Sequence, residues 1–354
     1  MNESNYLFHL TPEYDDQQEA AFLTMSGSPS PSLLLGVLVV ATMTVVGAKA
    51  LLLDPPLLGS RREFSPQRNA KIKKDENDEV DQQEISVAFL GNSILYYNDC
   101  PRLVEQMLRQ SYQNVVQDSC LRGGVNLSQL WIKGNGMRNK FASAAALLQD
   151  GRHDIGSPSP ESLLKSRDCW NFVVMNDHTQ GPAREATRTE TVQLLKEKLF
   201  PVFQAGKMTP VFLQTFAYKV RRMNGTEDLG DMKEYTKRLM EGYKQYQQAL
   251  QEMGLKECRI APVGEAVQWL SNHNNELWQK IYSWDDYHPS PHGTLLEAMI
   301  VFCTITRKPP PEYSPSWWQR CRYMQPPNEK PLPLPTHEEA LLLQQVACRV
   351  CDIE

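Results

Sequence analysis

The sequence has no surplus of positive charge. Its 354 residues include 37 Lys and Arg against 42 Asp and Glu, which gives a formal net charge of −5 at pH 7. A nucleic-acid-binding protein neutralises phosphates with an excess of Lys and Arg, so this composition argues against nucleic acid as a partner. With 41% hydrophobic and 22% charged residues, the chain has material for one sizeable core or two small ones.

The sequence also lacks the cysteine and histidine spacing of a zinc site. Cys348 and Cys351 form one C-x-x-C pair, but no second Cys or His pair stands at zinc-binding spacing from it. We therefore expect a terminal disulfide or two free thiols at these positions, and no metal site.

Lys and Arg are absent from residues 1–31, which are polar, acidic and end in a Ser, Gly and Pro-rich stretch. We predict that these residues form a disordered N-terminal tail. A cleaved signal peptide begins with a positively charged region, and that region is missing here. Its absence favours retention of the apolar segment that follows.

That segment reads LLLGVLVVATMTVVGAKALLL, from Leu33 to Leu53, and Lys49 is its single charged residue. Its length matches the ~20 residues that cross a bilayer as a helix. The sequence AKA at residues 48–50 resembles a signal-peptidase site, but the acidic lead-in favours an anchor. We predict a transmembrane helix over residues 32–53 and a single-pass membrane protein.

The side of the membrane on which the rest of the chain lies stays open. Basic residues follow the span and place the C-terminal part in the cytosol by the positive-inside rule: Arg61, Arg62, Arg68, Lys71, Lys73 and Lys74. All 8 cysteines follow the span, and Asn224-Gly225-Thr226 is a glycosylation sequon. Both features suit an oxidising compartment and favour the lumenal or extracellular side.

Residues 54–84 are rich in charge and proline and read as a stalk, which leaves residues 85–354 as the globular domain. Apolar runs typical of buried strands stand at 85–93, 115–124, 170–177, 209–217 and 257–264. Helical patterns separate them, including 189–207 with a kink or break at Pro201, a long amphipathic stretch at 233–254 and a closing helix at 294–306. This alternation predicts an α/β fold, a three-layer sandwich around a central parallel sheet of about five strands.

Ligand sites in such sheets lie at the carboxyl ends of the strands. Ser93 ends the first predicted strand, and Asp285 and His288 lie in a loop after the fifth. A hydroxyl, an imidazole and a carboxylate are the parts of an acyl-transfer site. We predict Ser93 as the nucleophile, His288 as the base and Asp285 as the residue that orients it.

Donors for a developing oxyanion also stand at strand ends. The candidates are the backbone N–H of Ser93, the backbone N–H of Gly124 and the side-chain amide of Asn176. Gly123 fits the second position as well as Gly124 does. Glycine suits that position because the missing Cβ lets a substrate approach the N–H.

Each of these residues also has a structural interpretation. Ser93 can cap the following helix, and the glycine pair can form an ordinary turn. His178 is a second candidate base, although its place beside the third strand suits a substrate contact better. Asp286 can replace Asp285, but the Asp-x-x-His spacing favours Asp285.

The four motifs together resemble the SGNH hydrolase superfamily, also called GDSL-type esterases. GNS at 91–93, RGGVNL at 122–127, VMND at 174–177 and DDYHPS at 285–290 resemble its four blocks in order, and the similarity spans about residues 85 to 305. The resemblance implies an SGNH or flavodoxin-like fold and a serine esterase that needs no cofactor. Two positions depart from the family pattern: Asn92 stands for Asp in the first block, and Val174 stands for Gly in the third.

The sequence therefore predicts a membrane-anchored serine esterase that hydrolyses a carboxylic ester through an acyl-serine intermediate. Its substrate is a small-molecule or glycan ester, with an O-acetylated carbohydrate favoured by the polar segment 219–235, a candidate lid. Two alternatives stay open: a catalytically inactive SGNH-fold binding module, which Asn92 and Val174 support, and an O-acyltransferase.

Overall fold

The computed structural model describes residues 81–137, 157–220, 225–321 and 330–354. The predicted tail at 1–31, the predicted span at 32–53, nearly all of the predicted stalk and the sequon residue Asn224 lie outside these ranges. None of the helices within the described ranges combines the length and the apolar character that a bilayer crossing requires.

Five parallel strands form the central sheet, in the order β2-β1-β3-β4-β5. Their bounds are β1 (Asp81–Gly91), β2 (Tyr112–Leu121), β3 (Phe172–Met175), β4 (Thr209–Leu213) and β5 (Arg259–Ala261). Each strand overlaps one of the five apolar runs of the sequence. The predicted parallel sheet of about five strands is confirmed.

The side chains of β1 alternate between two hydrophobic cores. Val87 and Phe89 belong to one core, whereas Ala88 and Leu90 belong to the other, and all four are almost fully buried. A strand covered on both faces reads as a continuous apolar run, because successive side chains point to opposite faces of the sheet. The two cores make the predicted three-layer arrangement.

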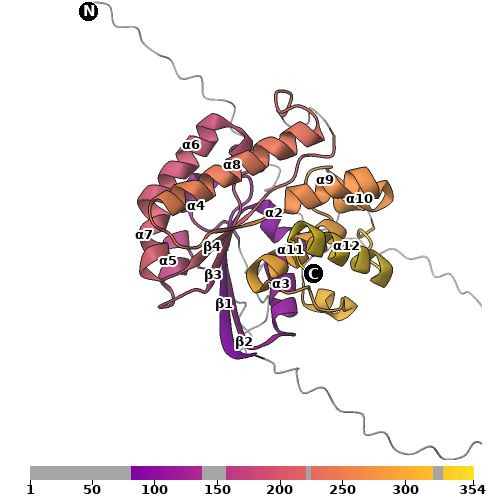
Figure 1. Ribbon diagram of the computed structural model, residues 1–354, viewed down its shortest axis with the longest axis horizontal. Coiled ribbons are helices and arrows are strands. Elements are labelled where there is room, and N and C mark those ends of the chain that lie inside the picture. The colour runs from indigo at the N-terminus through magenta and orange to yellow at the C-terminus, as the bar shows by residue number, and fades with distance from the viewer. Residues whose placement is uncertain (1–80, 138–156, 221–224, 322–329) are drawn as a thin grey trace, which may run out of the picture. The chain divides into compact units, whose positions relative to one another are not determined.

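One face of the sheet carries five helices from the middle of the chain, including the longest helix (Figure 1). These are α4 (Leu127–Lys133), α5 (Pro160–Lys165), α6 (Glu185–Leu194), α7 (Phe200–Ala205) and α8 (Met232–Glu252). A π-helical segment, residues 195–199, joins α6 to α7 immediately before Pro201. The helix does not break at Pro201: it continues as a change of helix type, because a proline removes a backbone donor and its ring crowds the preceding turn.

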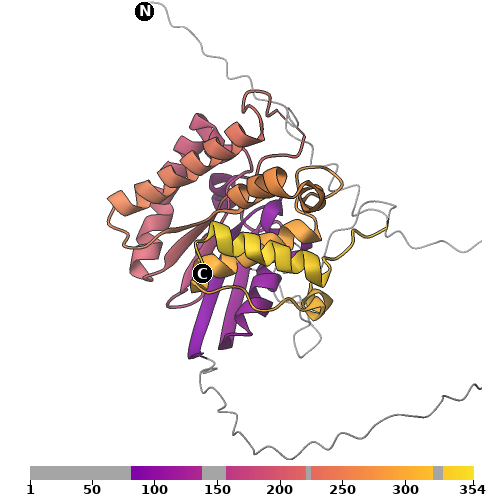
Figure 2. The same cartoon turned by 45° about the vertical axis from the view of Figure 1, so that its right-hand side comes forward.

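The other face carries α3 (Cys100–Leu108), α9 (Val263–His273), α10 (Asn275–Ile281), α11 (Pro291–Thr306) and α12 (His337–Val350). Short elements complete the fold: α2 (Ser93–Tyr96), η1 (Tyr97–Asp99), η2 (Gly181–Ala183) and η4 (Pro315–Arg320). The closing helix predicted at 294–306 is α11, but it is not the last, since α12 packs along it (Figure 2).

The carboxyl ends of the strands meet at one edge of the sheet. Gly91 at the end of β1 pairs in register with Leu121 of β2, and Leu90 pairs with Met175 of β3. The loops after these strands therefore start side by side, and they carry the glycine, asparagine and serine residues of the predicted site.

The C-terminal cysteines are free. Cys348 and Cys351 stand at the end of α12 as thiols, which is one of the two outcomes expected from their spacing. Across the described residues, no group of three or more His, Cys, Asp or Glu side chains is arranged to hold a metal ion.

Candidate active site

Ser93 is the first residue of α2 and follows β1 through a sharp turn. Asn92 adopts an extended backbone and caps the helix, since its Oδ1 accepts a hydrogen bond from the N–H of Ile94 at 3.2 Å. The cap is therefore Asn92 and not Ser93. This leaves the hydroxyl of Ser93 available to other partners.

Three predicted site residues form one hydrogen-bonded chain. The Nε2 atom of His288 lies 2.8 Å from Oγ of Ser93, and its Nδ1 atom lies 2.6 Å from Oδ2 of Asp285. Ser93 and His288 are 195 residues apart in sequence. For the imidazole to donate to the carboxylate and accept from the hydroxyl, its proton sits on Nδ1.

Asp285 holds both the ring and the backbone of the turn. Its Oδ1 accepts the N–H groups of Tyr287 at 3.2 Å and His288 at 3.0 Å, while Oδ2 faces the imidazole. Burial raises the pKa of Asp285, but the hydrogen bonds from His288 and from the two backbone donors outweigh it, so the pKa lies below its ordinary value. Asp285 is therefore a carboxylate at neutral pH.

The neighbouring Asp286 faces another way. Its carboxylate forms an ion pair with Lys219 at 3.2 Å, and its backbone takes a positive φ of 61°. The carbonyl of Asp286 accepts the N–H of Lys219 at 2.9 Å. The geometry therefore places Asp285, and not Asp286, against His288, and it attaches the start of segment 219–235 to the turn of the triad.

Asn92 and Asn176 connect the nucleophile loop to the end of β3. The N–H of Asn92 donates to Oδ1 of Asn176 at 3.2 Å, and Nδ2 of Asn176 donates to Oδ1 of Asn92 at 2.8 Å. Gly91 is required beside this pair, because a Cβ there would lie 1.8 Å from Oδ1 of Asn176. Close packing thus fixes the loop that presents Ser93.

Asn176 is fully buried, and its side-chain amide has two acceptors inside the protein. Besides Asn92, it donates to the carbonyl of Asp177 at 3.1 Å. One N–H thus holds the nucleophile loop, and the other makes the longer contact with the adjacent carbonyl. The structure places this amide beside the loop of Ser93.

Gly124 lies in an exposed turn after β2 with a positive φ of 66°. A Cβ added there would meet no atom within 4 Å, so backbone conformation and not crowding explains the glycine. Gly123 does not share this positive φ. The sequence predicted a glycine here so that a substrate can approach the N–H. The positive φ of Gly124 is a second reason for glycine at this position.

Asp177 was not among the predicted site residues, although it anchors the region. Its Oδ1 accepts the N–H groups of Leu127 at 3.1 Å and His178 at 2.8 Å. Its Oδ2 accepts the hydroxyls of Thr191 at 2.8 Å and Tyr246 at 2.6 Å. Three helices are thereby attached to the end of β3, and a carboxylate directly after a buried strand was the available signal.

His178, the alternative base, lies in the loop after β3. Its Nδ1 accepts a hydrogen bond from the N–H of Gln180 at 3.4 Å, and burial lowers the pKa of His178. Nearby, Arg184 forms an ion pair with Asp228 at 2.8 Å. Residue 228 belongs to the candidate lid, so this pair ties the described part of segment 219–235 to the start of α6.

Aromatic rings surround His288. The ring of Tyr97 stacks on the imidazole with centroids 3.9 Å apart and planes 11° apart, and the ring of Tyr287 lies at 4.1 Å and 41°. Trp284 in turn lies 6.2 Å from Tyr97. The sequence did not predict these aromatic members of the site, because contacts between residues far apart in the chain leave no spacing pattern.

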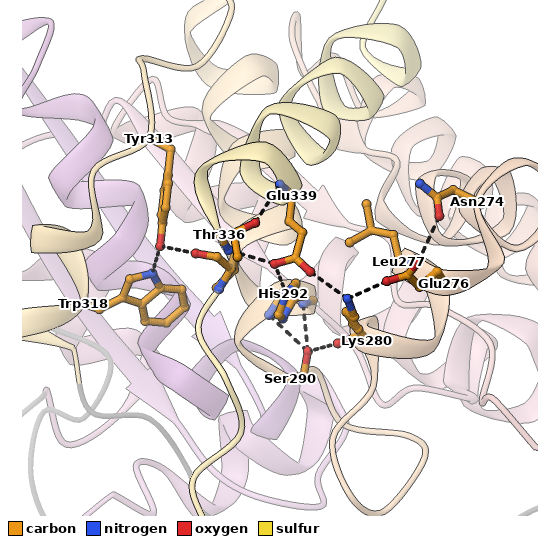
Figure 3. Close-up of polar contacts among 12 residues, drawn as sticks. Asn274, Glu276, Leu277, Lys280, Ser290, His292, Tyr313, Trp318, Thr336 and Glu339 are labelled. Carbon is orange, nitrogen blue, oxygen red and sulfur yellow. Dashed lines mark hydrogen bonds and ion pairs between the residues drawn. The ribbon is translucent and has the colours of Figure 1, made fainter.

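A second layer of polar residues supports the turn from the side of α12 (Figure 3). Ser290 caps α11, since its Oγ accepts the N–H of His292 at 3.1 Å, and it also donates to the carbonyl of Lys280. Glu339 of α12 contacts Nε2 of His292 at 3.1 Å and Nζ of Lys280 at 2.8 Å. The C-terminal helix is thereby connected to the segment that begins two residues after His288.

Electrostatics of this layer favour a charged Glu339 and a neutral His292. Burial raises the pKa of Glu339, but hydrogen bonds from Lys280, the Thr336 backbone and His292 lower it overall to about 2. Burial lowers the pKa of His292, with only partial opposition from Glu339. The carboxylate therefore acts as the acceptor of the cluster.

Comparison with known proteins finds solved structures that are similar to this chain, but no similar sequence. No protein-family model matches the chain, and no curated protein is significantly similar to it. Among solved structures, a candidate SGNH hydrolase from Slackia heliotrinireducens is 20% identical with a TM-score of 0.44, covering 63% of this chain and 100% of its own.

Two further solved structures are similar to the chain. A DUF4886 family protein from Bacteroides uniformis is 14% identical with a TM-score of 0.49, covering 77% of this chain and 97% of its own. A gut microbial diltiazem-metabolizing enzyme is 14% identical with a TM-score of 0.38, covering 63% of this chain and 48% of its own. At these scores and identities, the similarity identifies neither the family nor the activity of the chain.

Proposed function

We propose that the chain is a serine esterase that hydrolyses a carboxylic ester through an acyl-serine intermediate. The observation that supports it most is the continuous chain of contacts from Ser93 through His288 to Asp285, with distances of 2.8 and 2.6 Å. A hydroxyl becomes a competent nucleophile near neutral pH when a neutral imidazole accepts its proton. The carboxylate keeps the imidazole in the tautomer that can do so.

In the first step, Oγ of Ser93 attacks the ester carbonyl while its proton passes to Nε2 of His288. The C–O bond to the leaving alcohol then breaks, and the imidazolium returns the proton to that alcohol. In the second half, water attacks the acyl-serine while its proton passes to His288. The bond between the acyl carbon and Oγ of Ser93 then breaks, the acid is released, and the imidazolium returns the proton to Oγ. Asp285 stays ionised and stabilises the imidazolium in both halves.

The oxyanion of each tetrahedral intermediate needs donors. We assign this role to the backbone N–H groups of Ser93 and Gly124 and to the amide of Asn176. For Asn176, the planar amide keeps both N–H groups in fixed directions, one towards Asn92 and one towards the Asp177 carbonyl at 3.1 Å. We assign the second N–H to the oxyanion, which would share it with that carbonyl. Such a donor contributes mainly to the transition state.

The substrate class and the membrane anchor belong to the same proposal. The polar sequence of segment 219–235, whose residue Lys219 pairs with Asp286 next to the triad, favours a polar ester such as an O-acetylated carbohydrate over a long acyl chain. Residues Leu33 to Leu53 would hold the enzyme at a membrane. An alkaline carbonate wash tests the anchor. We expect the full-length protein to stay in the membrane pellet, and its release into the supernatant would contradict the anchor.

A panel of esters tests the activity. Full-length wild type, Ser93→Ala and His288→Ala are incubated with acetyl, butyryl and octanoyl p-nitrophenyl esters and with an acetylated xylan oligosaccharide. We expect wild type to release acid from the short-chain and sugar esters, and each variant to lose this turnover. The binding-module alternative gives no release by any of the three proteins.

The same panel separates hydrolysis from transfer. Acyl transfer would move the acyl group to an added alcohol or sugar, and its product would carry a new ester bond in place of free acid. Equal turnover by wild type and Ser93→Ala would contradict the acyl-serine mechanism directly.

A further inference from the structure

Tyr97 belongs to η1, which directly follows the helix that starts at Ser93. Its ring lies parallel to the imidazole of His288, with the centroids 3.9 Å apart and an interplanar angle of 11°. Tyr97 is 8% exposed and His288 is also 8% exposed, so the contact is shielded from water. Sequence offers no indication of it, because the two residues come from opposite ends of the domain.

Hydrogen bonds fix the distance between these two segments. Nδ2 of Asn98, the residue after Tyr97, donates to the carbonyl of Pro289, the residue after His288, at 2.9 Å. The same atom donates to Thr294 at 3.0 Å, whose hydroxyl donates to the carbonyl of Tyr97 at 3.3 Å. The side chains of Asn98 and Thr294 therefore connect the backbone beside Tyr97 to the backbone beside His288.

An aromatic face carries negative electrostatic potential and attracts a cation placed over it. In the mechanism above, His288 is neutral before each proton transfer and is an imidazolium in the transition state. A ring stacked on it stabilises the charged form more than the neutral form. Only an interaction that is stronger in the transition state accelerates the reaction.

We propose that Tyr97 is a positioning residue of the esterase that stabilises the imidazolium of His288 through its ring face and not through its hydroxyl. This inference rests on the proposed function and adds a residue to it. The other polar groups that face the imidazole are Asp285 at Nδ1 and Ser93 at Nε2, while the ring of Tyr287 lies at a tilt of 41° to it. Tyr97 is the group that covers the ring in parallel.

The test compares three substitutions at one position in the full-length protein. Tyr97→Phe keeps the ring, whereas Tyr97→Leu and Tyr97→Met replace it with apolar groups that lack a π face. Two rates are measured between pH 5 and 9: kcat for an acetyl ester, and the rate at which a fluorophosphonate labels Ser93. The thermal midpoint of each variant is recorded alongside.

We expect Tyr97→Phe to stay within about twofold of wild type in both rates. Tyr97→Leu and Tyr97→Met should lower kcat by about 3- to 30-fold at the alkaline plateau. The acidic limb of both profiles should move to lower pH, because the protonated imidazole has lost stabilisation. A role in packing alone would lower the rates equally at every pH and leave the limb in place.

The outcomes distinguish the two proposals. A wild type that labels at Ser93, together with Leu and Met variants whose profiles coincide with that of Tyr97→Phe, would overturn the role of Tyr97 alone. A loss of rate in Tyr97→Phe as large as in Tyr97→Leu would assign the effect to the hydroxyl and also overturn it. A folded wild type that neither labels nor turns over esters would overturn the esterase and the inference together.

Discussion

Asn92 and Asn176 are joined by two hydrogen bonds, one from the backbone N–H of Asn92 at 3.2 Å and one from the side-chain amide of Asn176 at 2.8 Å. Nδ2 of Asn92 also donates to the carbonyls of Val125 at 3.0 Å and Asp177 at 3.1 Å. Asparagine therefore uses both its donor and its acceptor here. An aspartate in its place could supply only the acceptor.

These contacts lead to a prediction about the asparagine at position 92, where the SGNH pattern that the sequence resembles has aspartate. Asn92→Asp should lower the free energy of unfolding by about 2–5 kcal/mol at pH 8, because the Val125 and Asp177 carbonyls both lose the Asn92 donor and face a carboxylate, and only Asp177 keeps a second donor, from Asn176. Protonation of the introduced carboxyl restores one donor, so the loss should shrink as the pH falls. Chemical denaturation of wild type and Asn92→Asp at pH 8 and pH 5 measures both effects. An Asn92→Asp protein as stable as wild type at pH 8 would contradict this account of the position.

The parallel sheet could be predicted from the sequence because its strands are buried on both faces. A run such as ISVAFL at residues 85–90 is continuous in apolar character, and five such runs alternate with helical patterns. Neither the order of the strands in the sheet nor the existence of helices α9, α10 and α12 could be predicted. Helix α12, for example, begins with a charged turn after a proline-rich stretch, and its buried stripe is narrow.

Polar members of the site were accessible to sequence reasoning because they stand at strand ends and in one short motif. Ser93, Asp285 and His288 lie together in the structure, as their positions predict. The contacts of Tyr97 and Glu339 were not accessible, because each joins segments far apart in the sequence. Side-chain stacking and ion pairs of this kind depend on tertiary packing alone.

Glu339 gives a prediction about pH-dependent stability. Because its pKa falls to about 2 in the folded protein, its stabilisation is present above the unfolded value of about 4.3 and is lost as the pH falls towards 2. Glu339→Gln should destabilise the protein at pH 7 by about 1 kcal/mol, a modest figure because the Lys280 side chain is 38% exposed and solvent screens the pair. The difference from wild type should vanish near pH 2–3.

Glu276→Gln is the matched control for this substitution. Glu276 also pairs with Lys280, at 3.0 Å, but its side chain is 83% exposed. It should have almost no effect on the thermal midpoint. Equal effects of the two substitutions, or no dependence of the Glu339→Gln effect on pH, would contradict the role given to the Glu339 cluster.

Glu297 gives a prediction of opposite sign: its contribution to stability should fall as the pH rises. It is 0% exposed within α11, neither carboxylate oxygen has a hydrogen-bond partner among the described residues, and burial raises its pKa well above the ordinary value. A raised pKa means that the folded state holds the proton, so stability falls as the pH rises above about 4.3 until the folded pKa is passed. Glu297→Gln and Glu297→Leu should both flatten the thermal midpoint between pH 5 and 9. A slope unchanged from wild type would show that this carboxyl does not titrate on unfolding.

Asp285→Asn tests the orienting carboxylate. The amide cannot accept Nδ1–H through its nitrogen and cannot stabilise an imidazolium, so kcat should fall by about 10²- to 10⁴-fold. Asp286→Asn is the matched control, because Asp286 pairs with Lys219 and not with His288. It should keep kcat within about threefold. A larger loss in Asp286→Asn than in Asp285→Asn would reverse the assignment.

The most direct measurement of the central claim is fluorophosphonate labelling of the full-length protein, with the modified residue located by mass spectrometry. An activated nucleophile should give a single adduct on Ser93 in the wild type, and the labelling rate should drop by about 100-fold or more in His288→Ala at an unchanged thermal midpoint. Folded wild type without an adduct on Ser93, or His288→Ala labelled as fast as wild type, would contradict the claim that these residues form an esterase site.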